Sequence, residues 1–335
     1  MFHNSYIINS AVSATDSSTV PSLIDKTQNV LEHGSGRDNN PLAPVRDPSE
    51  LDAAVPGFVP TFNLAAYVNK SPLLQEFVKL GVELHKWDKR QGVSSLVLRK
   101  DFQTDIRPVI QFLVDNKVSP HALGTFLTKN PLIFRESLDD LQVRVNYLQA
   151  KRFSKKQIGR ILEHNPNWLL FSTERIDNRL GFFQQTFALK GQELRNIATV
   201  APKLITWSLW DVKLMNFSLL EELGFTKDQM KSLLIKKPNL WLTNRDSLKK
   251  SFDVANNLMN LSHETILQFP QVLDCREFRL RQRHLYLEFL SKCQYDPQRE
   301  NYVSPLALVA GSDAEFCENV AKTPVQHFNS FLKTL

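Results

Sequence analysis

The sequence predicts an all-α superhelical solenoid in which one helical unit is repeated along the chain. Two observations support this prediction: prolines recur at nearly equal intervals, and residues at fixed distances from each proline repeat in character. The intervals between successive prolines are 35, 36, 36 and 32 residues. The prolines that set this register are Pro131, Pro166, Pro202, Pro238 and Pro270.

The first helix of each unit is expected to end at its proline. Proline lacks an N–H group and forces the preceding residue out of the α conformation, so a helix stops there. Apolar residues placed four positions before the proline give the helix one buried stripe. These residues are Leu127, Leu162, Ala198, Leu234 and Ile266.

A short apolar turn and a second helix are expected after each proline. The second and third residues after it are apolar in every unit, beginning with Ile133 and Phe134. Six residues after it, four units have a side chain that can cap a helix N-terminus, and Arg276 replaces this cap in the last unit. The four caps are Ser137, Ser172, Ser208 and Asn244. The second helix should run for about 16 residues and bury the residue ten positions after the proline. That position holds Leu141, Ile176, Val212, Leu248 and Leu280.

Three regions are expected along the chain. Residues 1–60 are rich in proline, glycine and serine without helical periodicity, which predicts a disordered leader or linker related to a transit segment. Residues 61–303 form the repeat array, in which residues 84–118 are a degenerate unit with Gln91 in place of the proline. Residues 304–335 are expected to form a C-terminal helical cap.

The charge of the chain favours a polyanionic partner. Its net charge is +6, and residues 1–60 carry −4, which leaves +10 on residues 61–335. Basic residues recur at a few offsets from the prolines, so stacking of the units should place them on one nucleic-acid-binding surface. The alternative is that they are solvated flanks of amphipathic helices. The candidate site residues are Arg144, Arg175, Arg179, Lys213, Lys249, Arg279 and Arg283.

A second basic cluster lies at a turn between two units and is a candidate phosphate clamp, although turn lysines often only aid solubility. It comprises Lys151, Arg152, Lys155 and Lys156, followed by Arg160.

Other function classes find little support in the sequence. It contains no phosphate-binding glycine loop, dinucleotide fingerprint, zinc-protease motif or serine-hydrolase elbow, and only 11 glycines. Its three cysteines are too few and too irregularly spaced for a zinc knuckle or a disulfide framework. No apolar run approaches the roughly 20 residues that span a bilayer. The sequence therefore predicts a binding module without cofactor, metal or membrane segment, and not an enzyme.

The repeating unit resembles a known family. A helix ending in L-x-x-x-P, an apolar doublet and a capping serine are typical of the mitochondrial transcription termination factor (mTERF) family. The segments LGTFLTKNPLIF at 123–134 and QFPQVLDCREFRLRQRHLYL at 268–287 most resemble the third metazoan branch of that family. The resemblance covers the chain from about Phe58 to Leu335. It implies a left-handed superhelix of mTERF-type three-helix repeats, a mitochondrial matrix location and nucleic-acid binding along a basic groove.

The same resemblance implies specific partners. These are double-stranded mitochondrial DNA in the promoter region, with repression of transcription initiation, and ribosomal RNA, with a part in large-subunit biogenesis. Transcription or ribosome-assembly proteins are further implied partners of a monomer. Two alternatives stay open: a helical protein scaffold, and an array of the TPR or PPR type that binds peptides or single-stranded RNA. The mid-unit proline belongs to neither of those repeat patterns.

Overall fold

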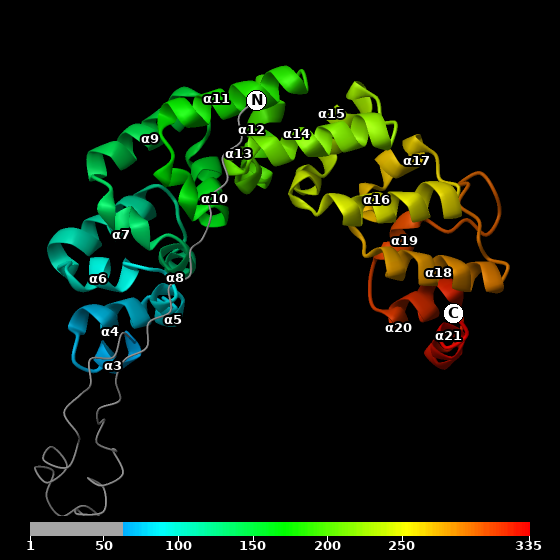
Figure 1. The fold of residues 1–335 in the computed structure, drawn as a ribbon, viewed down its shortest axis with the longest axis horizontal. Coiled ribbons are helices and arrows are strands. Elements are labelled where there is room, and N and C mark those ends of the chain that lie inside the picture. The colour runs from blue at the N-terminus through cyan, green and yellow to red at the C-terminus, as the bar shows by residue number, and fades with distance from the viewer. Residues whose placement is uncertain (1–62) are drawn as a thin grey trace, which may run out of the picture. The chain divides into compact units, whose positions relative to one another are not determined.

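The computed structural model describes residues 63–335, so the prediction for residues 1–60 lies outside the described residues. Within this range every regular element is a helix, and the prediction of an all-α solenoid is confirmed. Figure 1 shows the helices succeeding one another in chain order, unit after unit.

The first helix of every unit ends two residues before its proline, as the sequence predicts. The residue in between leaves the helical conformation, with φ between −124° and −141° and ψ between 61° and 77°. This backbone is outside the α region, which a following proline ring disfavours. The first helices are α8 (Pro120–Lys129), α10 (Lys155–His164), α12 (Gly191–Val200), α15 (Lys227–Lys236) and α17 (His263–Gln268).

Each proline then opens a short helix of five residues, where the sequence predicts only a turn. Proline suits the first position of a helix because the N–H group it lacks would have no partner there. All five prolines are buried, and so are the apolar residues two and three positions further on. The units therefore have three helices, as the family resemblance implies. The short helices are η2 (Pro131–Arg135), η3 (Pro166–Leu170), α13 (Pro202–Thr206), η5 (Pro238–Leu242) and η7 (Pro270–Asp274).

The second helices begin at the predicted caps. Ser137, Ser172, Ser208 and Asn244 each accept a hydrogen bond from the N–H group three residues ahead, whereas Arg276 makes no side-chain cap. The helices run for 13 or 14 residues, slightly shorter than predicted, and two of them finish in a wider π-helical turn. They are α9 (Leu138–Ala150), α11 (Thr173–Thr186), α14 (Leu209–Phe217) with η4 (Ser218–Glu222), α16 (Arg245–Asp253) with η6 (Val254–Leu258), and α18 (Glu277–Phe289).

Further helices precede and follow these five units. The degenerate unit consists of α5 (Leu84–Asp88), α6 (Val93–Leu98), η1 (Phe102–Ile106) and α7 (Arg107–Asp115), after α3 (Ala65–Val68) and α4 (Pro72–Lys79). At the C-terminal end lie α19 (Pro305–Val309), α20 (Asp313–Phe316), η8 (Cys317–Ala321) and α21 (Val325–Leu332). Pro305 follows Pro270 by 35 residues and opens a short helix, so it is a sixth proline of the register that sequence reasoning missed. The domain boundaries at 60 and 303 stay predictions.

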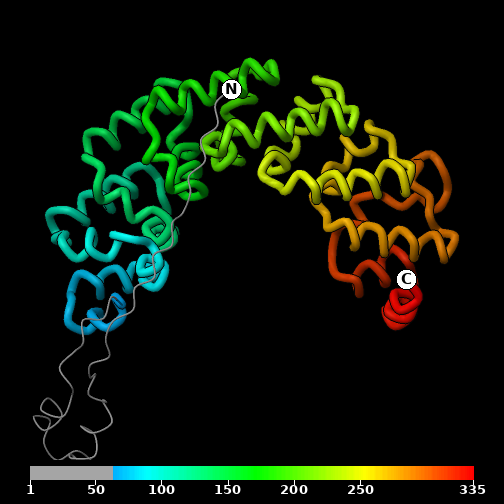
Figure 2. The backbone as a smooth tube through the Cα atoms, viewed as in Figure 1, coloured from blue at the N-terminus to red at the C-terminus, as the bar shows by residue number. Residues whose placement is uncertain are grey.

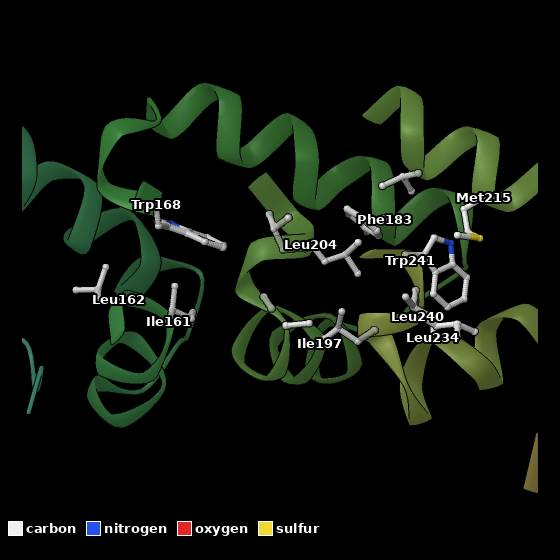
Figure 3. Close-up of a cluster of buried hydrophobic side chains, with 14 of the residues drawn as sticks. Ile161, Leu162, Trp168, Phe183, Ile197, Leu204, Met215, Leu234, Leu240 and Trp241 are labelled. Carbon is white, nitrogen blue, oxygen red and sulfur yellow. The ribbon is translucent and has the colours of Figure 1, made fainter. Parts of the chain in front are cut away.

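Equivalent helices of neighbouring units pack on one another, and the tube in Figure 2 shows the repeated path of the chain. First helices contact first helices (α8 with α10, α10 with α12, α12 with α15), short helices contact short helices, and α9 contacts α11. The core is continuous between units, as the side chains from Ile161 to Trp241 show in Figure 3. The five residues ten positions after the prolines are all buried, with at most 2% of their surface exposed, which confirms their predicted place between units.

Candidate nucleic-acid interface

Three of the candidate arginines share one offset, 13 residues after the proline, and they share one structural role. Each lies on a second helix and donates hydrogen bonds to backbone carbonyls in the last turn of the short helix of the next unit or just after it. Arg144 donates to the carbonyl of Leu169 and pairs with Glu136 at 2.6 Å. Arg179, which is 8% exposed, donates to the carbonyls of Ile205, at 3.1 Å, and Trp207. Burial, and then the nearby charge of Arg175, lower the pKa of Arg179.

Arg283 repeats this contact at the last full unit. Its guanidinium makes five hydrogen bonds: to the carbonyls of Leu308 (3.0 Å), Ala310 (2.8 Å) and Gly311 (3.1 Å), and two to Asp313 Oδ1 (2.7 and 3.1 Å). These bonds use all five N–H donors of the side chain. The acceptors Leu308 and Ala310 stand three and five residues after Pro305, the same offsets as Ile205 and Trp207 after Pro202. Arg283 is fully buried, so it joins two units and offers nothing to a ligand.

Arg175 and Lys213 have a different setting. Both side chains are exposed, and neither has a carboxylate partner among the described residues. Arg175 lies over the ring of Phe171, 4.6 Å from its centroid, and Lys213 lies 5.9 Å from the centroid of Phe182. The aromatic rings support these cations without neutralising them. Their charges are free to face an external anion.

The remaining two candidates differ from each other. Lys249 pairs with Glu222 at 2.5 Å, and this bond is the main cause of the lowered pKa of the Glu222 carboxyl. Arg279 is half-buried and lines a cavity at the start of α18, and its side chain has no hydrogen-bond or ion-pair partner in the described part of the chain. The charge of Lys249 is therefore neutralised within the protein, whereas that of Arg279 is not.

Most cations of the turn cluster have no ion-pair partner among the described residues. Lys151 pairs with Asp177 at 2.5 Å, and Tyr147 donates a hydrogen bond to the same carboxylate, at 2.6 Å. The other four members, Arg152, Lys155, Lys156 and Arg160, are exposed and make no ion pair within residues 63–335.

The structure thus brings the candidates together in pairs. Arg175 and Arg179 flank Phe171, with Arg179 at 5.8 Å from the ring centroid, and Arg279 and Arg283 line the cavity beside α18. Sequence reasoning missed Arg276, which lines the same cavity and which the sequence indicates only as a missing helix cap. Nucleic-acid binding by the seven candidates stays a prediction, and hydrogen bonds to backbone carbonyls of the next unit separate Arg144, Arg179 and Arg283 from the rest.

Two further properties concern the described residues. None of the helices in 63–335 combines the length and apolar character needed to cross a bilayer. In the same range no group of three or more His, Cys, Asp or Glu side chains could hold a metal ion.

Comparison with known proteins gives the family. The mTERF family model matches residues 74–316, which is most of the chain. Transcription termination factor 3, mitochondrial, of Drosophila melanogaster is 48% identical over 276 residues, covering 82% of this chain and 78% of the fly protein. The proteins of the same name from Rattus norvegicus and Mus musculus are each 39% identical and cover 96% and 98% of this chain and 82% of their own length. The chain, with its proline-punctuated three-helix units, belongs to the mTERF family.

Proposed function

We propose that this protein is a mitochondrial nucleic-acid-binding regulator of transcription and acts as a binding module. The observation that supports it most is the similarity, over four fifths of the chain or more, to proteins named mitochondrial transcription termination factors. The unpaired cations Arg175, Lys213 and Arg279, on a region of net charge +10, provide the means of holding a phosphate backbone.

The finer proposal follows the family resemblance. The main ligand is double-stranded mitochondrial DNA in the promoter region, where the bound monomer represses initiation in the matrix. Ribosomal RNA is the second ligand, through which the protein supports biogenesis of the large ribosomal subunit. Transcription or ribosome-assembly proteins are the proposed protein partners. A regular array suits such ligands because its repeated units can contact the regularly spaced phosphates of a nucleic acid.

The test compares duplex DNA, single-stranded DNA and structured RNA in a titration at several salt concentrations. Each true phosphate contact contributes a slope of roughly −0.9 on duplex DNA or roughly −0.7 on a single strand. Replacing Arg175 and Lys213 together by glutamate should weaken binding more than tenfold and flatten the salt dependence. Arg179 is unsuitable for this test because a glutamate there would face buried carbonyl oxygens.

The matched control is the Lys79→Glu and Lys86→Glu double variant. It makes the same change in net charge, at lysines that already pair with Glu76 and Glu83, each at 2.7 Å. Equal weakening by both double variants would mean that net charge alone attracts the ligand. Absence of binding to all three nucleic acids at low salt would reject the proposal and favour the protein scaffold.

A further inference from the structure

A cavity of 630 Å³ lies at the C-terminal end of the array, between η7, the start of α18, and α19. In Figure 1 these helices adjoin one another in the orange and red part of the chain. The volume is within the range of small-molecule sites, about 300 to 1,000 Å³.

The cavity has an excess of positive charge. Its lining contains four cations, Lys237, Arg276, Arg279 and Arg283, and two carboxylates, Asp274 and Asp313, a net charge of +2. Two of the cations pair with the two carboxylates: Lys237 with Asp274 at 2.7 Å, and Arg283 with Asp313 at 2.7 Å. Burial raises the pKa of the Cys275 thiol in the same lining, so this group adds no negative charge at neutral pH. The excess therefore resides on Arg276 and Arg279.

The two unpaired arginines are presented by a rigid frame. Arg283 fixes α18 to the segment 308–313 through all five of its donors. Arg279 lies one turn before Arg283 on the same helix, and Arg276 lies three residues before Arg279. Their guanidinium groups, which have no hydrogen-bond partner among the described residues, have ten N–H donors in all, which suit the several oxygens of a phosphate.

One side of the lining is aromatic. Phe278, 52% exposed, stands between Arg276 and Arg279 in the chain and lines the cavity, together with Gln271 and Gln282. An exposed ring beside unpaired arginines offers a stacking surface next to a phosphate site, and carboxamides can bond to a base edge.

We infer that this cavity binds one nucleotide, with Arg276 and Arg279 holding its phosphate and Phe278 stacking on its base. The inference rests on the proposed function and narrows it to a discrete site. The bound nucleotide is either one nucleotide of a DNA or RNA strand or a free nucleotide, and the experiments below distinguish the two.

Calorimetric titration of the full chain with AMP and with inorganic phosphate tests the free nucleotide. We expect AMP to bind, the Arg276→Gln and Arg279→Gln double variant to weaken AMP at least tenfold, and Phe278→Ala to weaken AMP more than phosphate. The matched control is the Lys89→Gln and Lys227→Gln double variant, which removes two exposed cations that do not line the cavity and should leave AMP binding unchanged. The side chains of Arg276 and Arg279 have no hydrogen-bond or ion-pair partner among the described residues, so the pocket variant should keep its helical circular dichroism and thermal midpoint.

Titration with a single-stranded oligonucleotide tests whether the cavity holds a nucleotide that is part of a strand. If AMP does not bind, the pocket variant should still weaken the oligonucleotide at least tenfold and reduce the salt slope by roughly 1.4, the value for two lost contacts on a single strand. The inference is overturned if AMP fails to bind and the pocket variant binds the oligonucleotide like the unmodified protein. If no nucleic acid binds but AMP does, the proposed function fails and the cavity assignment stands; if neither binds, both fail.

Discussion

The guanidinium of Arg179 lies between two units and is surrounded by the backbone of the next one. It donates to the carbonyl of Ile205, in the last turn of the short helix α13, and to that of Trp207, which follows the helix. A serine replaces arginine at this offset in one unit, and Ser251 Oγ donates to the carbonyl of Cys275, at 2.7 Å. In four of the five units, offset 13 thus holds a side chain that donates to a carbonyl of the next unit, whereas the fifth has the apolar Met215 there.

Replacing Arg179 by methionine should lower the free energy of unfolding by about 2–4 kcal/mol, because two carbonyls in or near the core lose a charged donor. Chemical denaturation monitored by circular dichroism measures the change. Arg175→Met is the matched control: that side chain is exposed and loses only a cation–π contact, worth about 0.5–1 kcal/mol. Equal effects of the two substitutions would contradict the assigned role of Arg179.

His284 makes the last full unit sensitive to acid. Burial lowers its pKa, and its Nδ1 is 2.8 Å from the hydroxyl of Tyr295 and 3.1 Å from Cys293 Sγ. Burial also raises the pKa of Tyr295, so the neutral imidazole lies beside a protonated hydroxyl. The folded state therefore binds a proton less readily than the unfolded chain does. Stability is full above the unfolded pKa of about 6.5 and falls as the pH falls through it, by at most about 1.4 kcal/mol per pH unit.

Thermal melts between pH 7.5 and 5 measure this dependence. We expect His284→Gln to be less stable at pH 7.5 but to lose less stability on acidification than the unmodified protein. His327→Gln, at an exposed position on α21, is the control and should keep the original pH profile. An unchanged profile in His284→Gln would assign the acid sensitivity to other groups.

At the scale of the helices, the second helices share an ending that the sequence conceals. The second residue after each of the five, and after α7 of the degenerate unit, has a positive φ: Arg152, Ala188, Gly224, Asn260 and Ser291, and Lys117 after α7. This left-handed residue turns the chain toward the next unit. Only Gly224 is the residue type that adopts this conformation without strain, and the others are held there by the packing of the units.

Ala188→Gly should therefore stabilise the protein by about 0.5–1 kcal/mol, since relief of the left-handed strain exceeds the added entropy of the unfolded chain. Gly224→Ala should destabilise it by a similar amount. A Cβ at Gly224 would have only His263 Nε2 nearby, at 3.8 Å, so the effect reports conformation and not a steric clash. The denaturant midpoints of the two variants should move in opposite directions. Movement in the same direction would show that other contacts, and not the left-handed conformation, determine the change in stability.

The sequence predicts a helix end well when a residue at that end causes it, and poorly when packing against a distant segment causes it. Proline and the capping hydroxyls act on their own backbone, so first-helix ends and second-helix starts could be placed from the sequence. The left-handed endings could not, because packing imposes them on lysine, arginine and alanine. Likewise, the recurrence of Arg144, Arg179 and Arg283 indicated a shared role, but that role is to bond to carbonyls about 25 residues away in the chain, which the sequence alone does not show. Arg276, which stands outside this recurrence, has no side-chain partner among the described residues.

At the scale of the whole array, each unit is stabilised mainly by its neighbours. The contacts join equivalent helices of adjacent units, and the core passes from one unit to the next without a single centre. The free energy of such an array is close to a sum of unit terms and nearest-neighbour interface terms. A defect should therefore weaken a local group of units before the entire molecule unfolds.

Leu248→Ala provides the test of that expectation. Leu248 is 1% exposed on α16, and its truncation should cost about 2–5 kcal/mol through lost burial and a residual cavity. Hydrogen exchange should show reduced protection in α14, α16 and α18, whereas α8 and α9, more than two units away, keep theirs. Leu258→Ala is a matched control on the same second helix, because that side chain is 38% exposed. A uniform loss of protection from α8 to α18 would show that the array unfolds as one cooperative body and that its units are not energetically separable.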